Sequence, residues 1–122
     1  MTSASDRKAL IREYKESYRP MGAFRILNRT NGLMFVGSSV NLPAIFNRLR
    51  MELRANGYRK HPDLQKDWNA CGEEAFEFEV LAELDAPEAP GVDVSDDLAA
   101  LESLWLEELK PWGQRGYNRP PS

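Results

Sequence analysis

Two short apolar segments separated by an Asn-Gly pair constrain the fold of this chain most strongly. Residues 22–28 and 33–37 are rich in Phe, Ile, Val and Met, and Asn31-Gly32 lies directly before the second segment. Asn and Gly accept the positive φ angles that tight hairpin turns require. The pattern therefore predicts an antiparallel β-hairpin, and with it a fold built on an antiparallel sheet.

Helices are predicted before and after the hairpin along the sequence. Residues 6–18 have a short apolar stripe that indicates a helix, and Pro20 follows it. After the hairpin, Asn41 precedes Leu-Pro, which suits the N-cap and first turn of a helix. Gly57 is suited to end that helix.

The second half of the chain predicts two more helices and a third strand. Residues 63–70 have helical spacing, and residues 76–80 alternate between apolar and acidic side chains, as a strand with one buried face does. A loop at 85–95 contains prolines and acids, and Ser95 is predicted to cap a final helix at 96–110. The expected fold class is α+β, a small antiparallel sheet of the hairpin and one further strand, flanked by helices.

The length of 122 residues predicts a single domain, residues 1–122. Residues 1–19 would form an N-terminal helical extension and residues 119–122 a loose tail. No apolar run reaches the roughly 20 residues that a membrane helix needs, so no membrane association and a cytoplasmic location are expected. One Cys and one His exclude an internal disulfide and leave little material for His/Cys metal sites.

The formal net charge of −3 hides an uneven distribution of charge. Residues 1–66 contain thirteen Lys and Arg against five Asp and Glu, whereas residues 67–122 contain three against fourteen. Such asymmetry is typical of a nucleic-acid surface or of an acidic tail. The predicted contacts to nucleic-acid phosphates are five arginines of the basic half, Arg25, Arg29, Arg48, Arg50 and Arg54.

Several short motifs follow one another in a recognisable order. They are Gly22-Ala23-Phe24 and Phe35-Val36-Gly37 on the hairpin, Leu64 to Asn69 with Phe76 to Phe78, Glu102 to Leu106, and Gly116-Tyr117-Asn118. Over roughly residues 20–118, this order resembles the GIY-YIG superfamily of small endonuclease domains.

The resemblance implies a phosphodiester-cleaving centre on the face of the sheet. In the family, a hairpin tyrosine activates water, an arginine on the following helix steadies the scissile phosphate, and a glutamate on a later helix binds one divalent metal such as Mg²⁺. A cation and an arginine together absorb the negative charge that develops at the phosphate.

This chain departs from the family pattern at three positions. Phe24 and Phe35 occupy the two tyrosine positions, and a phenyl ring cannot accept a proton. Ile45 occupies the arginine position, eight residues after Gly37. Arg48 lies one helical turn further on and could reach the same face, but a solvated helix face is the favoured interpretation of this residue.

Two positions of the pattern are retained. The resemblance makes Glu102 the metal ligand and, with Arg48 and Asn118, a candidate catalytic residue. A surface role for Glu102 and a local backbone contact for Asn118 are the alternatives. His61 is interpreted as a surface or capping residue rather than a general base, and Tyr58 as a packing residue.

Three functions are compatible with these residues. The favoured one is a nucleic-acid-binding domain, with DNA as partner, in which metal-dependent cleavage is weak or lost. The second is an active Mg²⁺-dependent endonuclease with a rearranged site. The third is a protein-interaction or structural domain, in which oppositely charged faces promote self-association.

Overall fold

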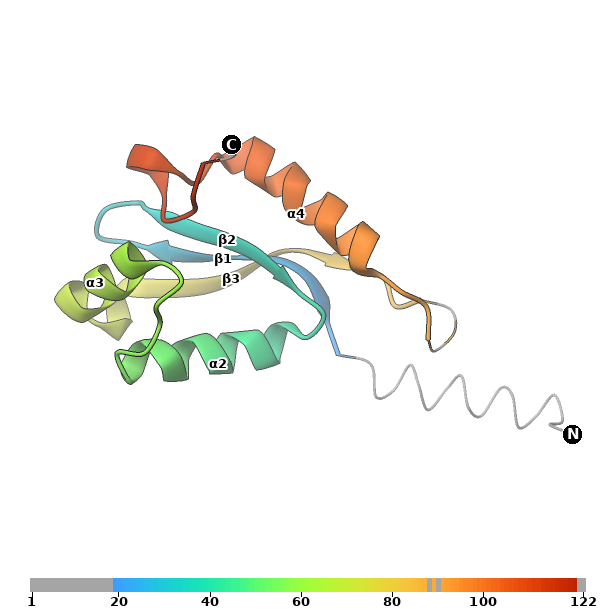
Figure 1. Cartoon of the computed structure of the whole chain (residues 1–122), viewed down its shortest axis with the longest axis horizontal. Coiled ribbons are helices and arrows are strands. Elements are labelled where there is room, and N and C mark those ends of the chain that lie inside the picture. Colours follow the sequence, from blue (N-terminus) through green and yellow to red (C-terminus); the bar gives the residue numbers. More distant parts are fainter. Residues whose placement is uncertain (1–18, 88, 90, 121–122) are drawn as a thin grey trace, which may run out of the picture.

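The structure is a computed structural model that describes residues 19–87, 89 and 91–120, and the helix predicted at 6–18 lies outside them. Three strands, three helices and two short 3₁₀ turns succeed one another along this part of the chain (Figure 1). Their bounds are β1 Met21–Asn28, β2 Met34–Ser39, α2 Leu42–Arg54, α3 Pro62–Cys71, η1 Glu73–Ala75, β3 Phe76–Leu84, α4 Ser95–Leu109 and η2 Gly113–Arg115.

The strands form one antiparallel sheet in the order β2-β1-β3, which confirms the predicted fold class. The central strand β1 pairs Phe24 with Gly37 of β2 and with Val80 of β3. The sheet therefore has β2 at one edge, and the C-terminal segment approaches this edge where Met34 pairs with Gly116 in an isolated bridge.

The hairpin forms where the sequence predicts it, with a longer turn than an Asn-Gly pair would make alone. The amide of Asn28 donates to the carbonyl of Leu33 at 2.8 Å, which closes a loop of four residues between them. Only Gly32 of the predicted pair has a positive φ, of 77°. Asn31 instead accepts a hydrogen bond from the Leu33 amide through its side chain.

The helices begin close to their predicted positions. The Asn41 side chain accepts from the amide of Ala44 and caps α2, as expected. The start of α4 differs from the prediction, because Ser95 is its first residue and no side chain caps it. Asp93 accepts hydrogen bonds from both the amide and the hydroxyl of Ser95, which fixes the chain at this point.

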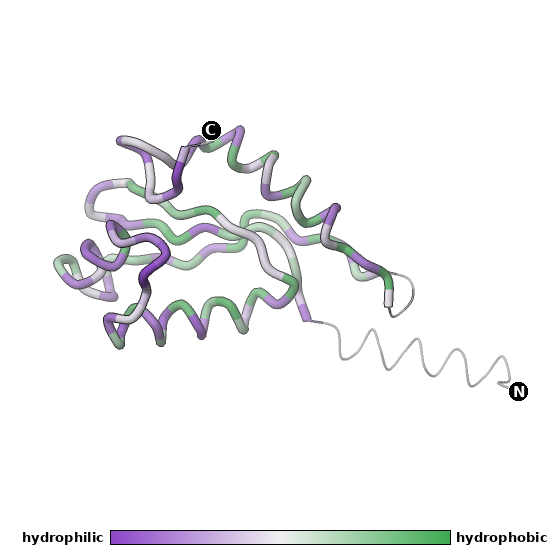
Figure 2. The backbone as a smooth tube through the Cα atoms, in the orientation of Figure 1, coloured by the Kyte–Doolittle hydropathy of each residue, from purple (hydrophilic) through white to green (hydrophobic). Residues whose placement is uncertain are grey.

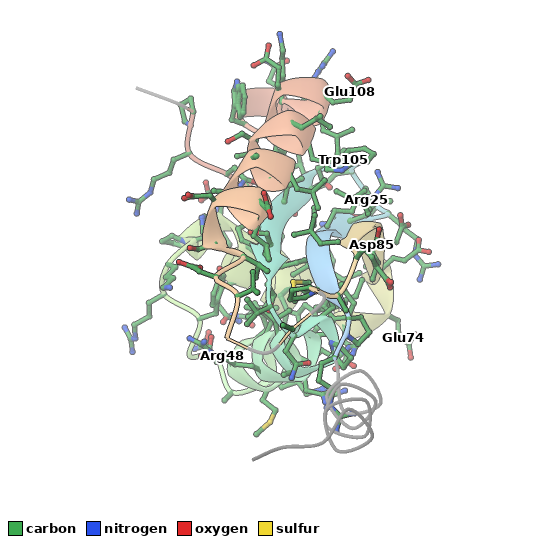
Figure 3. All side chains as sticks on the ribbon, turned by 90° about the vertical axis from the view of Figure 1, so that its right-hand side faces the viewer. Arg25, Arg48, Glu74, Asp85, Trp105 and Glu108 are labelled. Atoms are coloured by element: carbon green, nitrogen blue, oxygen red, sulfur yellow. The ribbon has the colours of Figure 1, made fainter. Side chains whose placement is uncertain are left out.

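The helices lie on two sides of the sheet. Figures 1 and 3 show α2 on one side and α4 on the other, and α4 contacts both β1 and β2. The main core, on the side of α2 and α3, includes Ile26, Leu53 and Leu64, all almost fully buried. Figure 2 shows hydrophobic stretches along the strands at the centre of the molecule.

Among the described helices, none has the length and apolar character needed to cross a membrane.

Candidate active site

A pocket of about 310 Å³ lies beside the edge strand β2, between α2, the chain after α2, α4 and the C-terminal segment. We call it the β2-edge pocket. It gathers the five positions that the family pattern singles out together with Arg48 and further polar side chains. Its lining includes Phe24, Phe35, Ile45, Arg48, Glu52, Tyr58, Lys60, His61, Glu102 and Asn118.

The two hairpin phenylalanines form the apolar wall of the pocket. Phe24 is 2% exposed, and its ring centroid lies 6.1 Å from that of Phe35 and 5.5 Å from that of Phe46 on α2. Gly37 faces the Phe24 ring so closely that an added Cβ would lie 3.0 Å from its nearest atom. This wall excludes water and offers no group that exchanges a proton.

Arg48 is the arginine of α2 that lines the pocket. Arg48 and Ile45 both lie on α2, and both line the pocket one helical turn apart. The Arg48 side chain is 62% exposed, and its Nε donates to Glu52 Oε1 at 3.2 Å. An exposed pair with i, i+4 spacing contributes little stability, so an anionic ligand can compete with Glu52 for the guanidinium at low cost.

Glu102 projects from α4 into the pocket and is half-buried. Its Oε2 accepts a hydrogen bond from the Ser38 hydroxyl on β2, which orients the carboxylate. Magnesium commonly takes one or two protein carboxylates and completes its shell with water and phosphate oxygens, so this oxygen donor fits a single Mg²⁺. Across the described residues, no three or more His, Cys, Asp and Glu side chains gather in a metal-binding group.

Asn118 lines the pocket, and its side-chain amide forms two hydrogen bonds with the edge of β2. The Val36 amide donates to Asn118 Oδ1 at 2.9 Å, and Asn118 Nδ2 donates to the Val36 carbonyl at 2.8 Å. The side chain thus pairs with β2 as a neighbouring strand would. Its contacts hold the C-terminal segment against the pocket.

Tyr58 and His61 line the pocket, and the sequence alone assigned neither of them a catalytic role. The Tyr58 hydroxyl lies 2.9 Å from His61 Nδ1, and the two rings are stacked at 5.8 Å. The His61 ring also contacts the Phe35 ring edge to face at 4.7 Å. No periodicity in the sequence predicts that a histidine in a loop contacts a phenylalanine of the hairpin. This cluster is therefore visible only in the folded structure.

Burial and nearby charges shift the acid–base behaviour of this pair. Burial, with Arg119 and Lys60 as further causes, lowers the pKa of His61 below its usual 6.5. Burial raises the pKa of Tyr58 above its usual 10.0, and the Glu52 carboxylate adds to the rise while Arg48 opposes it. At neutral pH the imidazole and the phenol are therefore both uncharged.

The arginines predicted to contact nucleic acid lie in different surroundings. Only Arg48 lines the β2-edge pocket, and Figure 3 shows it well separated from Arg25. The other four contact groups elsewhere in the protein: Arg25 pairs with Glu79, Arg29 donates to the Glu74 carbonyl, Arg50 lies 4.2 Å over the Phe78 ring, and Arg54 binds both oxygens of Glu73.

Two other cations border the pocket. Lys60 lines it directly, and Arg119 lines an adjoining pocket whose wall also contains Lys60, His61 and Asn118. Both are exposed, and among the described residues neither forms an ion pair. Together with Arg48 they provide positive charge around the mouth of the pocket.

The described part of the chain has the fold of the catalytic domain of a GIY-YIG nuclease. Among solved structures, it is similar to the catalytic domain of the homing endonuclease I-TevI, with 25% identity, a TM-score of 0.67, and coverage of 83% of this chain and 99% of that one.

A second similar structure is that of the catalytic domain of the intron endonuclease I-TevI with one glutamate replaced by alanine. It is 23% identical with a TM-score of 0.67, and the match covers 84% of this chain and 97% of that one. No protein-family model and no curated protein sequence matches the chain. The two structural matches confirm the fold that the sequence motifs predicted.

Proposed function

We propose that this protein binds a nucleic-acid strand, DNA in the first instance, with one backbone phosphodiester in the β2-edge pocket, and cleaves it slowly in the presence of a divalent cation. The observation that carries the proposal is the convergence of Arg48, Lys60, His61 and Glu102 on one pocket. The endonuclease names of the similar structures support the same class of reaction.

Binding would rest on the cations around the pocket. Arg48 would exchange its exposed contact with Glu52 for a charge-assisted bond to a phosphate oxygen. Lys60 and Arg119 would contact phosphates on one side of the bound one, because they border the same opening.

Cleavage would need Glu102, which would hold the cation with its carboxylate oriented by Ser38. A divalent ion bound there polarises the phosphate and lowers the pKa of bound water. Arg48 would stabilise the negative charge that develops on the phosphate oxygens. Slow turnover is expected, because the loss of one positioned electrostatic donor typically costs about 100–1000-fold in rate.

Binding is tested by fluorescence anisotropy with labelled single-stranded and duplex DNA and with RNA, at about 50 and about 200 mM salt. Arg48→Gln is expected to weaken binding by about tenfold and to lower the salt slope by about one. Arg54→Gln removes the same charge from a remote ion pair and serves as the matched control. An affinity that does not change with salt concentration, or an equal loss of affinity in the two variants, would contradict the proposal.

Cleavage is tested by incubating the same substrates with Mg²⁺ or Mn²⁺ and comparing the wild type with Glu102→Gln. The variant keeps the shape of the side chain and removes its charge, so metal-dependent cleavage should disappear while binding persists. Cleavage that continues in Glu102→Gln would exclude the β2-edge pocket as its origin.

A further inference from the structure

The β2-edge pocket needs a proton acceptor that is not on the hairpin. Hydrolysis of a phosphodiester by water releases a proton from the attacking water. Phe24 and Phe35 line the pocket with phenyl rings, which cannot take it. The acceptor must therefore be sought among the remaining polar groups of the lining.

Three of those groups are otherwise engaged. Glu52 pairs with Arg48 before substrate binds, and a carboxylate is ordinarily a weaker base than an imidazole near neutral pH. Glu102 accepts from Ser38 and is the oxygen donor for a cation. Tyr58 is 6% exposed and its pKa is raised, so its phenol holds its proton more firmly than a free tyrosine does.

His61 has the geometry that a proton acceptor in this pocket requires. It precedes α3 and is half-buried, and the Phe35 ring and the Tyr58 ring fix its plane from two sides. Its Nδ1 faces the Tyr58 hydroxyl at 2.9 Å, so its Nε2 is the nitrogen left for a molecule in the pocket. The imidazole lies against Phe35, the position at which the family pattern has a tyrosine.

Tyr58 is itself held in place from its backbone. Its amide donates to Gln65 Oε1 at 3.0 Å, and Gln65 Nε2 donates to the Leu53 carbonyl at 3.0 Å. This buried network joins the end of α2 to α3. With a proton on Nδ1 of the imidazole, the Tyr58 oxygen would be the acceptor of the hydrogen bond between them.

Burial, with two nearby cations as further causes, favours the neutral form of the imidazole before substrate binds. Lys60 and Arg119 face it from the preceding residue and from the C-terminal segment. Arg48 and Glu52 of α2 and Glu102 of α4 line the same pocket. A neutral imidazole with Nδ1–H bonded to Tyr58 leaves the lone pair of Nε2 free to accept a proton.

We propose that His61 is the general base of this pocket and accepts the proton of the attacking water on Nε2, with Tyr58 as a positioning residue that fixes the tautomer. The inference rests on the proposed phosphodiester hydrolysis. The water oxygen forms the new bond to phosphorus as its proton passes to Nε2. The bond from phosphorus to the departing sugar oxygen breaks, that oxygen takes a proton from solvent, and the imidazolium returns its proton to solvent.

The tautomer can be measured without any cleavage assay, because His61 is the only histidine of the chain. A long-range proton–nitrogen NMR spectrum of the untagged, full chain at neutral pH should show a neutral ring protonated at Nδ1. Tyr58→Phe should shift the population toward the Nε2–H form. A wild-type ring that is mainly Nε2–H would overturn the inference.

Kinetics give the second test, with DNA and Mn²⁺ as the assay. His61→Ala should lose about 100-fold or more in rate. Added free imidazole should restore part of it, which a merely structural role would not allow. Tyr58→Phe should keep part of the rate and move the acid limb of its pH profile. The exposed Lys66→Gln on α3 is the control that should cleave normally.

The outcomes separate this inference from the proposed function. Cleavage that survives in His61→Ala but is lost in Glu102→Gln overturns the role of His61 and leaves the nuclease function intact. Salt-dependent binding without any wild-type cleavage also overturns it and leaves the binding function. A wild type that neither binds nor cleaves nucleic acid overturns both. Thermal unfolding of each variant shows whether a loss arises from misfolding.

Discussion

The ion pair between Arg48 and Glu52 is weak enough for Arg48 to exchange Glu52 for a ligand in the pocket. The guanidinium lines the β2-edge pocket, yet its Nε contacts a carboxylate one turn further along α2. The pair is largely exposed, so its free energy is only a few tenths of a kcal/mol, roughly 0.3–0.5. Glu52 therefore competes with an incoming phosphate without locking Arg48.

We expect Glu52→Gln to tighten nucleic-acid binding by about two- to fourfold at low salt, because it frees Arg48 and removes a negative charge from the pocket. The gain should shrink as salt rises. Anisotropy titration measures it. Glu73→Gln, which frees Arg54 far from the pocket, is the control, and an equal gain there would contradict a local effect.

The sequence could predict some of the site residues and not others. Arg48 and Glu102 could be found, because helical spacing and the family pattern direct them to one face. His61 could not, since it lies in the chain between α2 and α3, where no periodicity fixes the direction of a side chain. Its contact with Phe35 joins residues 26 positions apart in the sequence and is visible only in the folded chain.

At the scale of elements, the C-terminal segment is the part that closes the site. Gly116 pairs with Met34, and the Tyr117 amide donates to the Met34 carbonyl at 2.9 Å. The Tyr117 hydroxyl donates to Asp67 at 2.7 Å and accepts from the buried Asn28 at 3.1 Å. These contacts join the hairpin, α3 and the last residues around one buried polar cluster.

Gly116→Ala should destabilise the fold by about 1–3 kcal/mol, because the new Cβ would collide with the carbonyl oxygens of Pro111 and Met34. Urea unfolding followed by circular dichroism measures the change. Gly57→Ala is the matched control, since its Cβ would meet only the Glu52 carbonyl at an ordinary 3.6 Å. Equal stability of the two variants would contradict this account of the docking.

Elements were easier to predict than their ends. The hairpin, α2, α3 and α4 all follow from turn chemistry, caps and apolar spacing, whereas β3 extends to Leu84, beyond the predicted 76–80. The alternation of acids that marks the first half of β3 fades after Val80, and pairing with Met21 and Gly22 of β1 extends the strand. Pairing with a neighbour is not visible in local sequence.

At the scale of the whole molecule, ion pairs bring the basic and acidic parts of the chain together. Arg25 with Glu79 and Arg54 with Glu73 each join a basic residue of the first half to an acid of the second. Two arginines of the basic half are thus neutralised away from the pocket. The positive charge that remains beside the pocket comes from the loop before α3 and from the C-terminal segment.

Stability should fall as the pH drops below the usual histidine value of about 6.5. The fold lowers the pKa of His61, so the unfolded chain binds a proton more tightly than the folded protein does. The stability that the neutral imidazole contributes is therefore present above about pH 6.5 and is lost as the pH falls through the pKa of the folded state. Urea unfolding between about pH 7.5 and pH 5 measures it. His61→Gln should flatten this part of the curve, and an unchanged slope would contradict the assignment.

Self-association of the oppositely charged faces stays a prediction, and light scattering across a salt series tests it. A species that becomes smaller as salt increases would support it, and a monomer at every concentration would contradict it.

The amide of Asn118 on Val36 also has a consequence for the solubility of the chain. β2 is an outer strand, and an outer strand with free amides and carbonyls is a template on which another chain can add. Gly116, Tyr117 and Asn118 occupy that row at Met34 and Val36. A protease that removed the last residues would therefore do more than open the pocket. It would expose a β-strand edge prone to intermolecular pairing and aggregation.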